Sequence, residues 1–297
     1  MNSQEFLDKV AKINVCKSGD KRSPHKPLLI LLCLGRVYAG KPRLVGFDEI
    51  EEELVSMLSY FGPLSARSTP QLPFWYLQSD GFWELPKTDG VMTKSGSISK
   101  KVLRDDKISG GFTIDIYELL KNDSELVQKV SDLILEIHFP PSLRQEILDE
   151  AGLDFEANLG SGSAKKAKRD PAFRKRVLEA YDYRCAICDF SVRMENTPVG
   201  LEAAHIKWFQ AGGPDVENNG LALCCLHHKL LDRGAIAFDN DLKIIISEKA
   251  NGHGGFQDWV LDFDGKPLRT PRNTEYLPKP EFTKWHINEV FQGKYKY

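Results

Sequence analysis

Cysteine and histidine side chains gather between positions 185 and 228, and their spacing is typical of a metal site. Cys185 and Cys188 are separated by two residues, which places two thiolates on one tight turn. Cys224 and His227 repeat this separation, with an imidazole as the fourth ligand. Thiolate and neutral imidazole suit a tetrahedral ion that has no open position. The four residues therefore predict a structural Zn2+ site.

Cys225 is a competing ligand for this site. Neighbours within one helical turn cannot both face the same ion, and Cys224 is preferred because it pairs at i, i+3 with His227. This choice leaves His228 rotated by about 100° toward another face of the helix. A redox pair or two unrelated buried thiols is the alternative for the first two cysteines, and the paired Cys-x-x-His disfavours it.

Three further side chains are expected to converge beside this metal site. The elements predicted around them are a strand over 199–206, a loop over 212–215 and a short strand that continues into a helix over 221–231. Strand, loop, strand and helix in this order bring together His205, Asn219 and His228. Hydrolysis of a phosphodiester needs a base that activates water, a divalent cation that neutralises the developing charge, and a group that holds the base in the right tautomer.

The motif Leu-Glu-Ala-Ala-His205-Ile, followed by Gly-Gly-Pro-Asp and by Asn219-Gly-Leu-Ala-Leu-Cys-Cys-Leu-His-His228, resembles the HNH (ββα-metal) nucleases. In that family the histidine of the His-Ile motif is the general base, the asparagine orients it, and the last histidine binds the catalytic metal. The resemblance implies these roles for His205, Asn219 and His228, with Mg2+ or Mn2+ as the catalytic ion and double-stranded DNA as the substrate.

One position departs from the family pattern. Many relatives have an aspartate or a histidine immediately before the base as a further metal ligand, whereas this chain has Ala204. The metal is then held by His228 together with substrate phosphate and water, which Mg2+ or Mn2+ tolerates. Glu202 is a weaker candidate ligand, and a solvated carboxylate is an equally good interpretation of this residue.

Length and composition indicate a two-part intracellular enzyme. The chain has 297 residues, of which 41% are hydrophobic and 28% charged, which suffices for two domains with their own cores. We expect a recognition domain over 1–157, a basic flexible linker over 158–170 and a nuclease domain over 171–297. The apolar runs are too short to span a bilayer, and the first residues lack the pattern of a signal peptide. Cys16 and Cys33 are expected to be free thiols, which suits a reducing cytoplasm.

The distribution of charge is more informative than the formal net charge of −2. The segment 165–184 contains eight cations and three anions. A basic segment directly before a nuclease motif predicts contacts with DNA phosphates, and a solvated linker face is the alternative.

The pattern before the linker mixes helices with short strands, so we predict an α+β fold in which an N-terminal DNA-recognition domain precedes the ββα-metal domain with its structural zinc. The expected helices lie around 3–13, 25–38, 47–60, 124–138 and 142–151, and the expected strands around 74–77 and 82–85. After the nuclease motif, we expect a hairpin over 235–246 and a closing helix over 280–291.

Two N-terminal segments resemble the sulfur-binding domain of phosphorothioate-dependent, McrA-like (type IV) restriction endonucleases. They are Arg22-x-x-His25-Lys26-Pro-Leu-Leu and Pro73-Phe-Trp-x-Leu with the following Gly-Phe-Trp-Glu-Leu. In that family an apolar cup closed by a proline ring holds the sulfur, and basic residues at a helix start hold the remaining charge. The resemblance implies that Arg22, His25, Lys26 and Pro73 bind DNA. Relatives often have an aromatic residue before the proline, whereas this chain has Leu72.

We therefore predict a modification-dependent endonuclease that recognises phosphorothioate-modified DNA and hydrolyses phosphodiester bonds nearby. Because two strands must be cut, a homodimer through the nuclease domain is expected, and a monomer that acts twice is the alternative. Two alternatives remain at this point: an HNH endonuclease directed at methylated or unmodified DNA, and a non-catalytic zinc-dependent DNA-binding regulator. The sequence does not define the flanking bases, the cleavage position, the preferred catalytic metal or the dimer interface.

Overall fold

The computed structural model describes residues 1–15, 23–63, 66, 69–93, 95–155, 170 and 172–296. The chain divides into two compact units, Met1–Ala164 and Lys165–Tyr297. Apart from Asp170, the predicted linker over 158–170 lies outside the described residues. Among the described helices, none combines the length and the apolar character that crossing a membrane requires.

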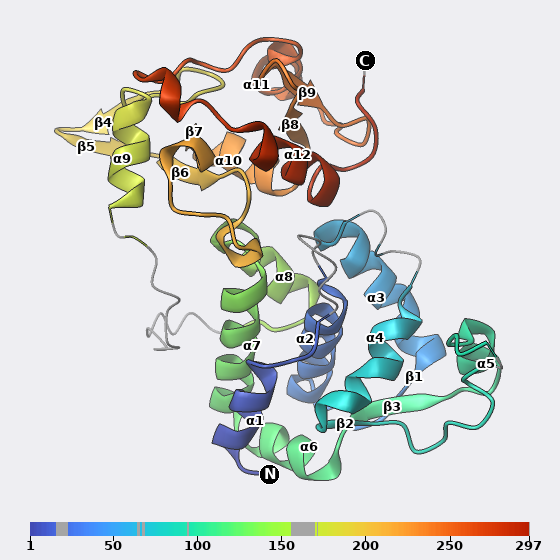
Figure 1. Cartoon of the computed structure of the whole chain (residues 1–297). Helices are drawn as coiled ribbons and strands as arrows, with labels where there is room; N and C mark the ends of the chain where they lie inside the picture. Colours follow the sequence, from blue (N-terminus) through green and yellow to red (C-terminus); the bar gives the residue numbers. More distant parts are fainter. Residues whose placement is uncertain are drawn as a thin grey trace. The chain divides into compact units, whose positions relative to one another are not determined.

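The described part of the first unit is mainly helical, with three short strands (Figure 1). Its helices are α1 (Ser3–Val10), α2 (His25–Tyr38), α3 (Phe47–Phe61), α4 (Gln71–Tyr76), α5 (Lys100–Asp105), α6 (Ile114–Asn122), α7 (Ser124–His138) and α8 (Arg144–Glu150). The strands β1 (Val45–Gly46), β2 (Trp83–Glu84) and β3 (Ser109–Phe112) form one antiparallel sheet with β3 in the middle. The prediction of an α+β fold is confirmed.

Helix α2 is the centre of this unit. Its run from Leu28 to Leu34 is buried on every side, which is typical of a helix that is apolar around its whole circumference. The helix contacts α3, α4, α6 and α7, and Figure 1 shows it between α7 and the pair α3 and α4. At Gly35 a Cβ atom would lie 1.7 Å from the carbonyl oxygen of Ala151, so the close packing of the chain after α8 requires glycine.

The strand predicted over 74–77 is wrong, because these residues belong to α4 and to the 3-10 helix that follows it, Leu77–Asp80. A short run of aromatic residues does not distinguish the two periodicities. Here tertiary packing favours the helix: Phe74 lies edge-on to Phe47 and Trp83, and the Trp83 indole donates a hydrogen bond to the Phe74 carbonyl. Pro73 lies in the first turn of α4, where a missing N–H has little cost.

The second unit is built around one β-hairpin and the helix that follows it. Strands β6 (Leu201–His205) and β7 (Gly220–Cys224) are antiparallel, and α10 (Cys225–Asp232) begins where β7 ends. Around them lie α9 (Phe173–Ala180), the hairpin β4 (Val192–Met194) and β5 (Thr197–Val199), the hairpin β8 (Ile236–Phe238) and β9 (Ile244–Ile246), α11 (Phe256–Trp259) and α12 (Pro280–Glu289). The predicted hairpin over 235–246 and the closing helix are confirmed.

Candidate functional site

The pairing of β6 with β7 determines where His205 and Cys224 lie in the hairpin. Leu201 pairs with Cys224 and His205 pairs with Gly220, so the base candidate lies at one end of the hairpin and the cysteine at the other. Cys224 is the N-cap of α10, which therefore carries His227 and His228 in its first turn. Strand, loop, strand and helix follow one another in the predicted order.

Four side chains come together as a candidate metal site. One ligand atom from each of Cys185, Cys188, Cys224 and His227 lies within 4.8 Å of the others. The Nδ1 atom of His227 is 3.1 Å from the Cys224 Sγ, while its Nε2 donates a 3.0 Å hydrogen bond to the backbone carbonyl of Trp259. A backbone partner on the second nitrogen is the usual way in which a metal-binding histidine is oriented. Cys225 is exposed and lies outside this cluster.

The three thiols and one imidazole of this cluster are suited to binding a cation. Hydrogen bonds from Cys188, Cys224 and His227 hold the pKa of the Cys185 thiol below its ordinary value, whereas the neighbouring thiols raise the pKa of Cys224. Burial disfavours a charged His227, yet the facing thiols raise its pKa to about 9. Closely spaced thiolates repel one another, so a divalent cation is what allows all of them to ionise together. The residues present therefore fit a metal ion such as zinc.

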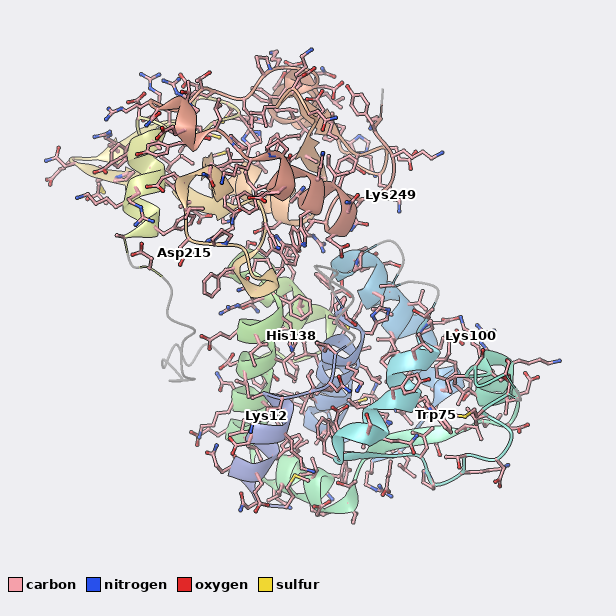
Figure 2. The ribbon with its side chains drawn as sticks, viewed as in Figure 1. Lys12, Trp75, Lys100, His138, Asp215 and Lys249 are labelled. Carbon is pink, nitrogen blue, oxygen red and sulfur yellow. The ribbon has the colours of Figure 1, made fainter. Side chains whose placement is uncertain are left out.

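His205 has a partner that the sequence did not reveal. Its Nε2 atom lies 2.8 Å from an oxygen of Asp215, a residue of the loop between β6 and β7 (Figure 2). Phe173, the first residue of α9, stacks on the imidazole with 4.2 Å between ring centroids and an angle of 20° between the planes. The sequence pattern indicates only a turn at Asp215, which follows two glycines and a proline.

The buried Asn219 side chain holds the loop rather than the imidazole. Its amide oxygen accepts a 2.9 Å hydrogen bond from the Lys207 N–H, and its amide nitrogen donates to the carbonyls of Lys207 and Pro214 at 3.0 Å. At Gly213 an added Cβ would lie 1.8 Å from the Lys207 carbonyl oxygen, so the loop closes tightly at this point. The amide of Asn219 thus bonds the backbone of the loop that follows His205, and its role in orienting the base stays a prediction.

His228 faces two carboxylates. Its Nδ1 is 2.6 Å from a Glu202 oxygen and its Nε2 is 3.2 Å from an Asp232 oxygen. Burial lowers the pKa of His228, but the hydrogen bonds and charges of Asp232 and Glu202 outweigh it and raise this pKa to about 10. Sequence reasoning missed Asp232, although its i, i+4 spacing from His228 on one helix was a usable signal.

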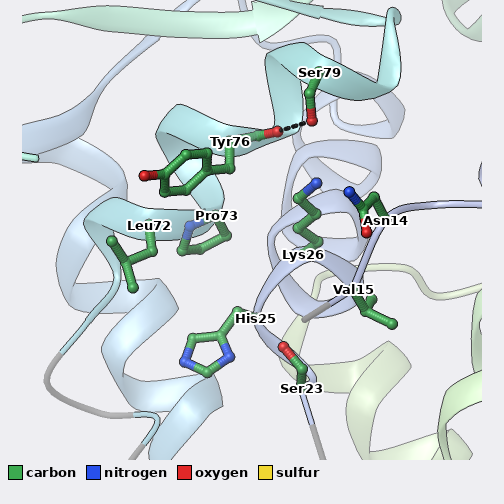
Figure 3. A pocket seen from close by; sticks show the side chains of 9 residues that line it. All are labelled: Asn14, Val15, Ser23, His25, Lys26, Leu72, Pro73, Tyr76 and Ser79. Atoms are coloured by element: carbon green, nitrogen blue, oxygen red, sulfur yellow. Dashed lines mark hydrogen bonds between the residues drawn. The ribbon is translucent and has the colours of Figure 1, made fainter. Parts of the chain in front are cut away.

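A cavity of about 210 Å³ lies where α2 and α4 begin, and it contains three of the predicted DNA-binding residues (Figure 3). Its lining comprises Asn14, Val15, Ser23, His25, Lys26, Leu72, Pro73, Tyr76 and Ser79. Pro73 and Leu72 face His25 and Lys26 across it, as Figure 3 shows. Arg22, the fourth predicted residue, lies outside the described residues.

The two basic side chains of this cavity have internal partners. Lys26 is buried and forms a 2.5 Å ion pair with Asp80, and an imidazole nitrogen of His25 lies 3.2 Å from the Thr69 hydroxyl. Burial lowers the pKa of His25, so the ring is mainly neutral at pH 7. The cavity therefore combines apolar walls with hydrogen-bond donors and carries little net charge.

The basic segment that precedes the nuclease motif contributes less free charge than its composition suggests. Lys165, Lys166, Lys168 and Arg169 lie outside the described residues. Arg176 is bound to Asp170 at 2.5 Å and to Glu217 at 2.7 Å. Two carboxylates thus offset the charge of this arginine, and contacts between the basic segment and DNA phosphates stay a prediction.

Two family models match the chain. The model for the ScoMcrA-like DNA sulfur-binding domain matches residues 3–156, and a model for HNH endonucleases matches residues 185–239. No protein in the curated set matches.

Several solved structures are similar to parts of the chain. The sulfur-binding domain of ScoMcrA complexed with phosphorothioated DNA is 21% identical, with 50% of this chain and 95% of that chain covered and a TM-score of 0.45. The corresponding SprMcrA complex is 21% identical over 52% of this chain and 95% of that chain, with a TM-score of 0.43. The type IV phosphorothioation-dependent restriction endonuclease ScoMcrA is 20% identical over 59% of this chain, with a TM-score of 0.44, and the match spans 38% of its own length.

Proposed function

The chain belongs to the ScoMcrA-like DNA sulfur-binding domain family, and from this premise we propose that it binds phosphorothioate-modified DNA and cleaves the backbone nearby. The family match agrees with the resemblance drawn from the sequence motifs. The second unit carries an HNH endonuclease domain, so the chain is a DNA endonuclease. The observation that supports the proposal most directly is that one chain contains both domains: one to bind the modified DNA and one to hydrolyse the backbone.

The cavity at the start of α2 suits a sulfur atom better than an oxygen atom. A sulfur that replaces a non-bridging phosphate oxygen is larger, more polarisable and less strongly hydrated. Pro73 and Leu72 offer it apolar contact, whereas an oxygen placed there without a hydrogen-bond partner would cost about 1–3 kcal/mol. We assign His25 and Lys26 to hydrogen bonds with the remaining phosphate oxygens, and Arg22 to the compensation of their negative charge.

Replacing Leu72 by serine is expected to weaken the preference for sulfur. The hydroxyl would provide an oxygen with a hydrogen-bond partner, which is worth about 1 kcal/mol, so the ratio of the two affinities should fall by roughly fivefold to tenfold. Binding of modified and unmodified duplexes by fluorescence anisotropy measures this ratio.

Val55→Ser is the matched control, because Val55 is half-buried in a different cavity, between α3 and α5. It should leave the ratio of affinities unchanged. A Leu72→Ser protein with the same ratio as the unsubstituted protein would remove Leu72 from the recognition of sulfur.

For hydrolysis we assign His205 as the general base, since a neutral imidazole can take a proton from the attacking water near pH 7. Asn219 holds in place the loop that follows His205. His228 is the proposed ligand of the catalytic ion, Mg2+ or Mn2+, with Glu202 and Asp232 beside it. When bound, such an ion supplies positive charge that offsets the negative charge developing at phosphorus.

We assign Zn2+ to the cluster of Cys185, Cys188, Cys224 and His227. Three thiols and one imidazole make a closed tetrahedral set, which is typical of a structural rather than a catalytic zinc. The ion would tie the turn before β4 to the start of α10. It would thus fix the helix that carries His228.

The catalytic ion is expected to bind more tightly as the pH rises. The pKa of His228 is raised from an ordinary 6.5 to about 10. The proton on His228 therefore stabilises the metal-free site. This stabilisation is complete below about pH 6.5 and is lost as the pH rises toward 10. Between these limits a cation must displace one proton. The Mn2+ concentration that gives half-maximal cleavage should therefore fall up to about tenfold for each pH unit, as a titration of rate against Mn2+ at pH 7, 8 and 9 would measure. A half-maximal concentration that stays constant across this range would contradict the assignment of His228.

Cleavage of both strands requires two active sites, and we propose that two copies of the chain supply them through the nuclease unit. The proposed place of action is the cytoplasm. The function is tested by incubating the chain and Mn2+ with matched duplexes that contain one phosphorothioate, 5-methylcytosine or neither. Cleavage of the first duplex alone supports the proposal, and equal cleavage of all three would refute it.

A further inference from the structure

The geometry points to Asp215 as the residue that positions the general base, in the place that the family pattern gives to an asparagine. This inference rests on the proposed role of His205. Asp215 lies in the loop between β6 and β7, and its side chain is only 12% exposed.

Both oxygens of the Asp215 carboxylate are engaged. One lies 2.8 Å from the His205 Nε2, and the other accepts a 2.8 Å hydrogen bond from the backbone N–H of Asp170. Arg176 fixes the surroundings, because it donates to the Asp215 carbonyl at 2.8 Å and also binds the Asp170 carboxylate. The Asp215 carboxylate is therefore held in place by Asp170, which precedes α9, and by Arg176 within α9, in addition to its own loop.

The imidazole is restrained in a second direction by aromatic rings. Phe173 stacks on one face of His205, and Phe209 lies at 6.1 Å in a tilted arrangement. Stacking fixes the plane of the ring but allows two orientations that differ by a rotation of roughly 180° around the Cβ–Cγ bond. The hydrogen bond to Asp215 selects one of them, so the two contacts together define the position of both ring nitrogens.

The chemistry of the partner then selects the tautomer. An ionised carboxylate can only accept hydrogen bonds, so the neutral imidazole carries its proton on Nε2 and its lone pair on Nδ1. Nδ1 is accordingly the atom that would take a proton from water. Asn219 cannot make this selection, because its amide group is bound to the backbone of Lys207 and Pro214. An amide at position 215 could donate to Nε2 and favour the opposite tautomer, as carboxylate-to-amide changes do in other His-carboxylate pairs.

The tautomer can be measured in the whole chain of 297 residues, prepared with Zn2+. The protein is labelled with 15N at its seven histidines, and a His205→Gln variant identifies the signal of interest. At pH 8 we expect the His205 ring to be protonated at Nε2, and the Asp215→Asn variant to be protonated at Nδ1.

Cleavage provides the second readout. With saturating enzyme, Asp215→Asn should cut a phosphorothioate duplex at least about 100-fold more slowly in a single turnover, while its affinity for that duplex stays within about twofold. Asp241→Asn is the matched control, since this exposed residue lies in the turn between β8 and β9, and it should cut at the unsubstituted rate.

Protonation of the unsubstituted protein at Nδ1 would overturn the inference, even if the variant fails to fold. An Asp215→Asn protein that cuts within about threefold of the unsubstituted rate would do the same. The position of the ring proton is measured without DNA, so it does not depend on the proposed function. A failure of the proposed function has a different result: the unsubstituted protein leaves the modified duplex intact.

Discussion

Replacement of His205 by alanine is expected to lower the rate of cleavage by about 10⁴-fold, while the affinity for phosphorothioate DNA stays unchanged. Alanine leaves no group that can take a proton from water, and general-base catalysis contributes up to about this factor. Binding should persist because the proposed recognition residues lie in the other unit, around the cavity of His25 and Pro73. Single-turnover cleavage and anisotropy with the same duplex measure the two quantities.

The matched control for this substitution is His253→Ala. His253 is an exposed histidine of the nuclease unit, so its loss removes an imidazole without touching the hairpin of β6 and β7. It should cut at the unsubstituted rate. A His205→Ala protein that retains more than about a tenth of that rate would exclude His205 as the general base.

Replacement of Cys224 by serine is expected to prevent binding of the proposed structural zinc and to unfold the nuclease unit. The serine hydroxyl is a poor ligand beside two thiolates, and structural zinc typically contributes on the order of 10 kcal/mol to folding. We expect metal content to fall from about one ion per chain to nearly none. A loss of several kcal/mol should lower the melting temperature of this unit by at least about 10 °C.

The neighbouring residue provides an internal control. Cys225 follows directly in the chain but is exposed and lies outside the metal cluster, so Cys225→Ser should keep both the metal and the melting temperature. Elemental analysis and thermal melts of both variants give the comparison. The opposite pattern, with metal lost from Cys225→Ser and retained by Cys224→Ser, would contradict the ligand set.

The sequence predicted the long helices well because their patterns are strong. Helix α2 has prolines at its start and an apolar run from Leu28 to Leu34, and α7 has a regular amphipathic repeat, so type and position could both be predicted. The short strands were harder. Strand β3 reads Ser-Gly-Gly-Phe, which lacks the β-branched residues of a typical strand, and its glycines are explained by packing: a Cβ at Gly111 would lie 2.1 Å from the Arg43 carbonyl oxygen.

In the candidate site, too, one part could be predicted from the sequence and another could not. Spacing along the chain sufficed to predict the metal cluster, because its two halves are local i, i+3 pairs whose ligand types limit the choice of ion. The partners of the two histidines proposed for catalysis, His205 and His228, depend on contacts between segments. Asp215 meets His205 only because the loop between β6 and β7 folds back, and Phe173 reaches the ring from α9, so neither contact has a periodic signature in the sequence.

The affinity of the full chain for a duplex with one phosphorothioate, compared with its oxygen counterpart at equal salt, tests the central claim most directly. Contacts with phosphate alone would bind both duplexes equally and would give both the same dependence on salt. We predict that the modified duplex binds roughly 5-fold to 150-fold more tightly, the range that corresponds to 1–3 kcal/mol, and that one of the two phosphorus stereoisomers accounts for the difference, because only one directs its sulfur into the cavity. Equal affinity for the oxygen duplex and for both stereoisomers would contradict the account.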